Sequence, residues 1–92
     1  MERINELRNQ IDVIDKQMAK LFVERINLVK QIAQIKKEIS YPSYDQGRET
    51  FILIRNGAYI EDKSIRMMYF EMMKKQFELT KKMQEDILHQ PN

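Results

Sequence analysis

The feature that most constrains the fold is an apolar repeat at helical spacing from Ile4 to about Ile39. Apolar positions three and four apart fall on one face of an α-helix, so the repeat predicts one continuous amphipathic helix. Its members are Ile4, Leu7, Ile11, Ile14, Met18, Leu21, Phe22, Leu28, Val29, Ile32 and Ile35. A helix of about 36 residues is about 54 Å long, whereas a compact domain of this size has a radius of gyration of roughly 12 Å. Because the chain cannot cover such a helix alone, we expect a two-fold dimer in which the long helices pair.

The few glycines and prolines divide the rest of the chain into two further helices and their connections. We predict a short helix from Gln46 to Arg55, ended by Asn56-Gly57, a pair suited to the left-handed conformation past a helix C-terminus. Tyr41-Pro42-Ser43 is interpreted as the connecting loop before it. A third helix is predicted to begin near Glu61-Asp62, and one face of it carries Ile65, Met68, Tyr69, Met72, Met83 and Ile87. The expected fold class is all-α, with one long, one short and one medium helix.

Composition indicates a small domain without disulfides. The 92 residues are predicted to form a single domain, residues 1–92, and the chain contains no cysteine for disulfides or thiolate metal sites. Its 16 basic and 14 acidic residues nearly balance, without the single-sign run typical of proteins that bind nucleic acids or membrane surfaces. No apolar run approaches a membrane span, and the N-terminus lacks the apolar core of a secretory signal. We therefore expect a cytoplasmic protein with no nucleic-acid or membrane partner.

Three basic residues are arranged to bind a small dianion. Arg25 and Lys36 are eleven positions apart, close to three helical turns, so their side chains share one face of the long helix. Arg8 is rotated about 100° from Arg25 and cannot readily serve the same pocket in one chain, but across a dimer axis it can enter the partner's pocket. A purely structural helical hairpin or dimer stays an alternative, because most apolar stripes at helical spacing are only core.

The charged residues and their intervals resemble the all-helical class of chorismate mutases. The segments that carry the resemblance are Leu7-Arg8, Ile11-Asp12, Ile14-Asp15, Glu24-Arg25, Ile35-Lys36 and Tyr44-Asp45-Gln46-Gly47-Arg48-Glu49. The resemblance covers residues 4 to 50 closely and the third helix more loosely. It implies an intertwined homodimer of three-helix chains. It also implies an isomerase that rearranges chorismate to prephenate, in the shikimate pathway branch of aromatic amino acid biosynthesis, without metal or cofactor.

The resemblance also implies a role for each matching side chain. Arg25 and the partner's Arg8 would clamp the two carboxylates of chorismate, a task for which the planar guanidinium is suited. Lys36 would donate to the ether oxygen, where negative charge grows as the bond breaks.

A second group of matching residues would form the wall around the ring hydroxyl. Glu49, with the backbone near Asp45, would bind this hydroxyl, and Arg48 would orient the wall. Asp45 has an equal alternative role, because an aspartate at this point is a typical helix N-cap.

In the third helix the match is weaker. When the third helix is aligned with the pattern of these chorismate mutases, Gln76 falls where the family commonly has a serine. Thr80 falls where the family has a glutamine or glutamate that contacts the ether oxygen. The Thr80 side chain is too short for that contact. Gln76 lies one helical turn before Thr80 and Gln84 one turn after it, and of the two only Gln76 is close to the depth in the pocket at which the contact is expected. A one-residue shift would bring Phe77 and Lys81 there and fits the apolar stripe less well. We therefore predict that Gln76 and Thr80 line the substrate pocket.

Two other functions stay open on the same scaffold. An isochorismate pyruvate-lyase would use a similar cationic pocket, although Asp45, Arg48 and Glu49 resemble the mutases more. A mutase-like regulatory or binding module would hold chorismate or prephenate with low turnover, and Thr80 is the residue that favours it.

Overall fold

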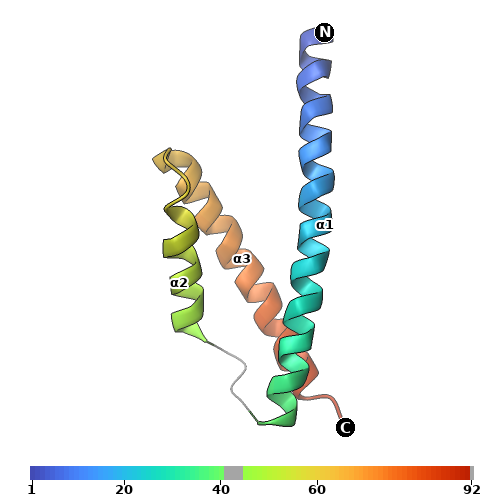
Figure 1. Ribbon diagram of the computed structural model, residues 1–92, viewed down its shortest axis with the longest axis vertical. Coiled ribbons are helices and arrows are strands. Elements are labelled where there is room, and N and C mark those ends of the chain that lie inside the picture. Colours follow the sequence, from blue (N-terminus) through green and yellow to red (C-terminus); the bar gives the residue numbers. More distant parts are fainter. Residues whose placement is uncertain (41–44, 92) are drawn as a thin grey trace.

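The computed structural model describes residues 1–40 and 45–91, which form three α-helices. α1 spans Glu2–Glu38, α2 spans Gln46–Gly57 and α3 spans Lys63–Leu88 (Figure 1). The all-α class and the order of a long, a short and a medium helix are confirmed. The predicted loop Tyr41-Pro42-Ser43, and Tyr44 of the charged motif, lie outside the described residues.

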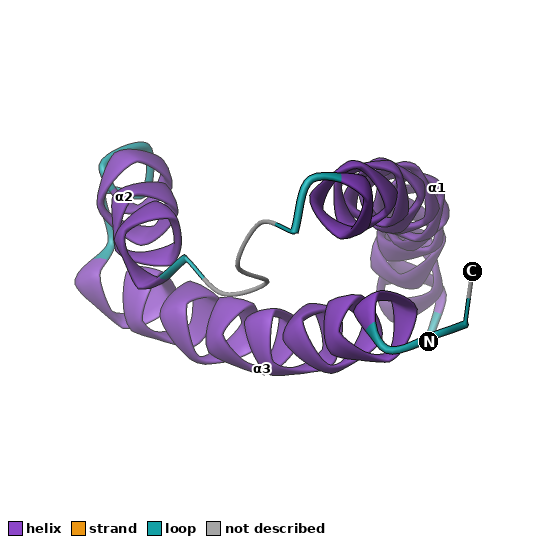
Figure 2. Ribbon diagram, turned by 90° about the horizontal axis from the view of Figure 1, so that it is seen from below, coloured by secondary structure: helices purple, strands orange, loops and turns teal. Residues whose placement is uncertain are grey.

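α3 is the element to which the other two helices attach. Its C-terminal half packs along the C-terminal part of α1, and α2 folds back beside its N-terminal half (Figures 1 and 2). α1 and α2 lie on the same side of α3, and in the described part of the chain no Cα atom of α1 lies within 8 Å of one in α2. The N-terminal half of α1 stands apart from both, so the chain measures 56 × 26 × 15 Å.

The buried core of one chain is small. Among the described residues, the buried apolar side chains are Ala33, Ile52, Met73, Phe77 and Ile87. Three of them, Ile52, Met73 and Phe77, form one cluster between α2 and α3. The apolar repeat in the first half of α1 is instead 43% to 62% exposed, at Ile4, Leu7, Ile11, Ile14, Met18 and Leu21. No described helix is both long and apolar enough to cross a membrane.

The covered face of α3 differs from the stripe that its periodicity indicates. Ile65, Met68 and Met72 lie on that stripe, yet about half or more of each side chain is exposed. The buried positions of α3 are Met73, Phe77, Thr80 and Ile87. Ile87 lies on the predicted stripe, as does Tyr69, which packs against the core, whereas Met73 and Phe77 lie on an adjacent face. α3 is apolar on two sides, and helical spacing alone does not tell which side is covered by the same chain.

Aspartates mark the starts of α2 and α3. Asp45 caps α2 by accepting a hydrogen bond from the Arg48 backbone N–H at 2.9 Å. Asp62 caps α3, as predicted, and accepts from the Ser64 and Ile65 backbone N–H groups at 2.8 and 3.3 Å. The Ser64 hydroxyl also donates to Asp62 at 2.6 Å. This hydroxyl, together with the two backbone N–H groups, holds the pKa of the Asp62 carboxyl below its usual value.

The prediction for the end of α2 is wrong. Gly57 is the buried last residue of the helix and does not adopt the left-handed conformation. Among the non-glycine residues that the structure describes, a positive φ occurs at Ser40, where it is 54°, just after α1. At Gly57 a Cβ atom would lie 2.7 Å from the ring of Phe70 on α3. Glycine leaves room here for the Phe70 side chain of another helix, which the local sequence pattern does not reveal.

Candidate active site

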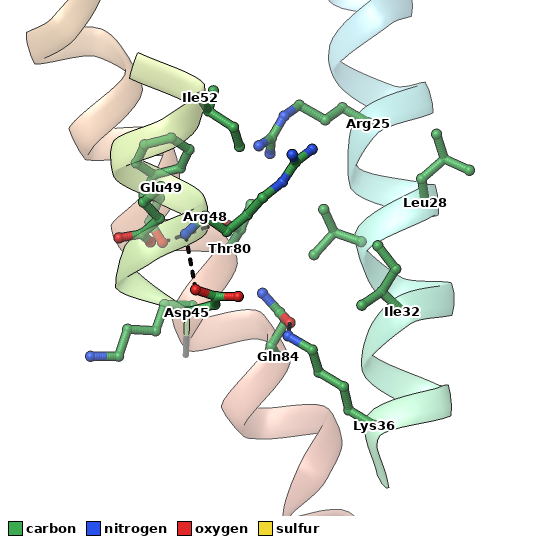
Figure 3. Close-up of a pocket in the computed structure, with 13 residues that line it drawn as sticks. Arg25, Leu28, Ile32, Lys36, Asp45, Arg48, Glu49, Ile52, Thr80 and Gln84 are labelled. Atoms are coloured by element: carbon green, nitrogen blue, oxygen red, sulfur yellow. Dashed lines mark hydrogen bonds between the residues drawn. The ribbon is translucent and has the colours of Figure 1, made fainter. Parts of the chain in front are cut away.

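A cavity of about 310 Å³ lies between the C-terminal part of α1, α2 and α3 (Figure 3). Its volume falls within the range of small-molecule sites. Its polar lining comes from all three helices and the cap of α2, and consists of Arg25, Lys36, Asp45, Arg48, Glu49, Thr80, Lys81 and Gln84. The rest of the wall is apolar and consists of Leu28, Val29, Ile32, Ile52 and Phe77.

Two guanidinium groups face each other at one end of the cavity, Arg25 from α1 and Arg48 from α2 (Figure 3). The Arg25 guanidinium lies over the Phe77 ring, 5.9 Å from its centre. The Nη1 atom of Arg25 is buried and has no hydrogen-bond partner among the described residues. A buried donor without an acceptor is costly, and a carboxylate satisfies a guanidinium with two parallel hydrogen bonds. This end of the cavity is therefore suited to a carboxylate ligand.

At the other end of the cavity, α1 and α3 are joined by a side-chain hydrogen bond. Lys36 Nζ donates to Gln84 Oε1 at 3.2 Å, and both side chains are half-buried. Because its carboxamide oxygen accepts from Lys36, Gln84 has its Nε2 group left to donate elsewhere. Lys36 and Gln84 thus place an ammonium and a carboxamide side by side at the cavity wall (Figure 3).

The remaining polar wall comes from α3 and from the start of α2. Thr80 is buried, and its hydroxyl donates to the Phe77 carbonyl oxygen at 3.2 Å. Asp45 lines the cavity and also caps α2, so the N-cap alternative for this residue is confirmed. Glu49 is half-buried on the α2 wall, one turn after the cap.

The structure brings most of the predicted site residues together. Six line this cavity: Arg25, Lys36, Asp45, Arg48, Glu49 and Thr80. Gln76 does not, and it lines instead an adjoining cavity of about 810 Å³ between α1, α2 and α3, which shares Arg25, Arg48 and Ile52 with the first. Arg8 lines neither cavity and lies about 25 Å along the α1 axis from Arg25. As its helical phase indicated, Arg8 does not reach the site of its own chain.

Gln84 lies where the sequence prediction placed Gln76. The two residues are one turn on either side of Thr80, and a shift by one turn keeps nearly the same helix face, so apolar spacing fits both registers. The distinguishing signal is chemical. Moving the alignment by four residues puts the hydroxyl of Thr80 where a serine is common and Gln84 where a glutamine is common. Phe77 and Lys81, which the spacing disfavoured, line the cavity as well.

Comparison with known proteins assigns the chain to a family. Residues 7–85 match the family model described as chorismate mutase type II. The chain belongs to this family. This match confirms the family that the charged residues of the sequence resemble. The matched range includes both Arg8 and Gln84. The three-helix, all-α architecture described above is the one that this resemblance implied.

Curated relatives of this chorismate mutase family member match part of the chain. The chorismate mutase of Methanocaldococcus jannaschii is 40% identical over 55 residues, 60% of this chain and 56% of that protein. The T-protein of Haemophilus influenzae is 36% identical over 53 residues, 58% of this chain and 14% of that protein. The bifunctional chorismate mutase/prephenate dehydratase of Aquifex aeolicus is 41% identical over 49 residues, 53% of this chain and 14% of that protein. The chain thus spans about half the length of the first relative and about a seventh of the others. No solved structure gives a significant match.

Proposed function

We propose that this chain is a chorismate mutase that rearranges chorismate to prephenate. The observation that carries the proposal is the cavity, in which the buried Nη1 donor of Arg25 lacks a partner and the Lys36–Gln84 pair lies at the opposite end. Chorismate carries two carboxylates, an ether oxygen and a ring hydroxyl, and these groups match such a donor set. The activity belongs to phenylalanine and tyrosine biosynthesis, and the proposal includes a cytoplasmic location.

The rearrangement needs only two things from the protein, which are positioning of the substrate and stabilisation of the developing charge. One C–O bond of the ether breaks while one C–C bond forms within the same molecule, and no proton or electron is exchanged with the protein. Catalysis therefore rests on positioning and on electrostatic stabilisation. Positioning contributes up to about 7–11 kcal/mol for well-oriented groups, and a unimolecular reactant gains less because only its internal rotations are frozen.

We assign the ether oxygen to Lys36 and Gln84. Negative charge grows on this oxygen as the C–O bond breaks, so donors placed there stabilise the transition state more than the ground state. The hydrogen bond from Lys36 to Gln84 Oε1 holds the carboxamide with its Nε2 group available to donate. Gln84 thereby supplies the contact for which Thr80 is too short, and this assignment replaces the expectation for Gln76.

The α2 wall binds the ring hydroxyl in this proposal. The Glu49 carboxylate accepts a hydrogen bond from the ring hydroxyl, and the backbone near Asp45 adds to the same wall. The Asp45 carboxylate already accepts from the Arg48 backbone N–H, so we assign it to holding the start of α2. The Arg48 and Arg25 guanidinium groups then share the carboxylate end of the substrate.

Product identification tests the function directly. Purified protein is expected to convert chorismate to prephenate, with an unchanged rate in the presence of a chelator, because the residues assigned here supply all the catalysis. Chorismate loss and prephenate formation are followed by NMR. Faster release of pyruvate from isochorismate than consumption of chorismate would identify a pyruvate-lyase instead. Binding of chorismate in calorimetry without turnover would identify a binding module.

We further infer a homodimer in which the N-terminal half of each α1 occupies the larger cavity of its partner. The solvent-accessible surface of the chain is 7679 Å², whereas a compact monomer of 11.2 kDa exposes roughly 5700 Å². The excess area is in the range that stable protein–protein interfaces bury. The radius of gyration, 16.9 Å, likewise exceeds the roughly 12 Å of a compact chain. Basic residues line the larger cavity, namely Arg25, Arg48, Arg55 and Lys75. The exposed apolar repeat of α1 is accompanied by four acidic residues, Glu2, Glu6, Asp12 and Asp15, and by four basic ones, Arg3, Arg8, Lys16 and Lys20, so the exposed apolar area and not net charge carries this inference.

Mixing two inactive variants tests whether Arg8 serves the partner's site. An Arg8→Ala chain retains Arg25, and an Arg25→Ala chain retains Arg8, so one site of each heterodimer has both arginines. After complete subunit exchange at equal amounts, activity is expected to recover to about one quarter of the wild-type value.

The matched control for this experiment mixes Arg25→Ala with Lys36→Ala. Both residues come from the same chain and the same site, so every site in the heterodimer lacks one of them and activity is not expected to recover. Absence of recovery in the Arg8→Ala and Arg25→Ala mixture, with exchange shown by native mass spectrometry, would rule out a shared site.

A further inference from the structure

The α2 wall of the site is held by α3, through the cluster of Ile52, Met73 and Phe77 and through a junction at the C-terminal end of α2. In the described part of the chain, the backbone of α2 packs on α3, and no Cα atom of α2 lies within 8 Å of one in α1. Yet α2 and its cap carry Asp45, Arg48 and Glu49, which lie across the cavity from Arg25 and Lys36 on α1. The angle at which α2 leaves α3 therefore sets the distance between the two halves of the polar lining.

Three residues meet at this junction, Gly57 at the end of α2 with Arg66 and Phe70 on α3, and we call them the elbow. A Cβ atom at Gly57 would lie 2.7 and 2.8 Å from Cε1 and Cζ of Phe70, and 3.7 Å from Cδ of Arg66. Real Cβ atoms essentially never show separations below 3.0 Å, so the backbone of α2 rests directly on the Phe70 ring. None of the three residues lines either cavity described above.

Arg66 fixes the turn that connects the two helices. Its Nε and Nη2 groups donate to the Ile60 carbonyl oxygen at 3.0 and 2.8 Å, and Nη2 also donates to the Glu61 carbonyl oxygen at 3.2 Å. The Ile60 backbone N–H donates to the Gly57 carbonyl oxygen at 3.0 Å. The rigid fork of the guanidinium thus holds two successive carbonyls of a turn that is also tied to the end of α2.

We propose that the elbow residues Gly57, Arg66 and Phe70 are positioning residues for the α2 wall of the active site. The kinetic part of this proposal rests on the proposed mutase function. Glu49 lies about 12 Å along α2 from Gly57, so a displacement at the elbow is carried to the far end of a rigid helix. A misplacement of about 1 Å can lower the rate of a reaction on the order of 10²-fold.

The central test is a double-mutant cycle with Gly57→Ala and Phe70→Leu. Gly57→Ala places a methyl group where the Phe70 ring lies, so the ring or α2 must move, and the substitution is expected to lower kcat/KM for chorismate on the order of tenfold. In the Phe70→Leu background, the smaller side chain leaves room for the added methyl group, and the same substitution is expected to cost less than about twofold. Tyr59→Ala is the matched control, since Tyr59 lies in the same turn but is 79% exposed, and it should leave kcat/KM unchanged.

A second readout does not depend on activity. In ¹⁵N NMR spectra, Gly57→Ala is expected to shift the backbone amide signals of Arg48 and Glu49, at the far end of α2, whereas Tyr59→Ala is not. If wild-type protein does not turn over chorismate, these shifts still test the elbow while the mutase proposal fails. Arg66→Lys keeps the charge and adds no bulk, but it loses the guanidinium that holds the two carbonyl groups of the turn. It should shift the same Arg48 and Glu49 amide signals, and it serves as the test if the Gly57→Ala protein does not fold.

Two results would overturn the proposal. The first is an equal loss of kcat/KM for Gly57→Ala in both backgrounds, because the effect would then not pass through Phe70. The second is a Gly57→Ala protein that melts at a higher temperature with full activity and unshifted Arg48 and Glu49 amides. Alanine favours a helix over glycine, so this is the result expected if the close contact does not constrain α2.

Discussion

Replacing Lys36 by alanine is expected to lower kcat for chorismate by at least about 10²–10³-fold, the effect of losing a preorganised donor worth about 2.7–4 kcal/mol in the transition state. Lys36 also holds the Gln84 carboxamide through the 3.2 Å hydrogen bond, so its removal disturbs both proposed donors to the ether oxygen. The loss should appear in kcat more than in KM, because these contacts strengthen as charge develops. Steady-state kinetics with chorismate measures both constants.

The neighbouring Lys37 offers a matched control for this substitution. Lys37→Ala removes the same charge from the last turn of α1, yet Lys37 lines neither cavity, so kcat should stay near the wild-type value. A Lys36→Ala protein that keeps kcat within tenfold, or an equal loss in Lys37→Ala, would contradict the assigned role.

Replacing Gln84 by alanine is expected to lower kcat by about 10²–10³-fold, because one of the two donors to the ether oxygen is lost. Gln76→Ala should leave kcat far less changed, since Gln76 lines the larger cavity and not the one that contains Lys36. Thr80→Gln should not raise kcat, because the carboxamide beside Lys36 already comes from Gln84. The assay is the same steady-state kinetics on folded protein.

The three variants together decide the register of α3. A larger loss of kcat for Gln76→Ala than for Gln84→Ala would show that Gln76, and not Gln84, contacts the ether oxygen. An increase in kcat for Thr80→Gln would show that the ether oxygen lacks a donor in the wild-type protein. Either result would contradict the assignment of Gln84, and circular dichroism and native mass spectrometry would confirm that helicity and the oligomeric state are unchanged.

Local sequence determined the helices and much of the candidate site. The apolar repeat from Ile4 to Ile39 predicted a helix that the structure places at Glu2–Glu38, because helical spacing is a property of neighbouring residues. Asp62 predicted the start of α3 through its ability to accept backbone N–H groups. Arg25 and Lys36 were placed on one wall by their spacing on a single helix, which needs no knowledge of how helices pack.

Only the tertiary structure decided how the helices are placed relative to one another. A one-turn shift along α3 leaves its apolar face nearly unchanged, so spacing did not choose between Gln76 and Gln84, whereas packing against α1 places Gln84 beside Lys36. Gly57 was predicted to be a left-handed cap, whereas in the structure the Phe70 ring of another helix lies where its Cβ atom would be. In both cases the deciding contact joins residues far apart in the chain, and such distances are fixed by packing and not by helical periodicity.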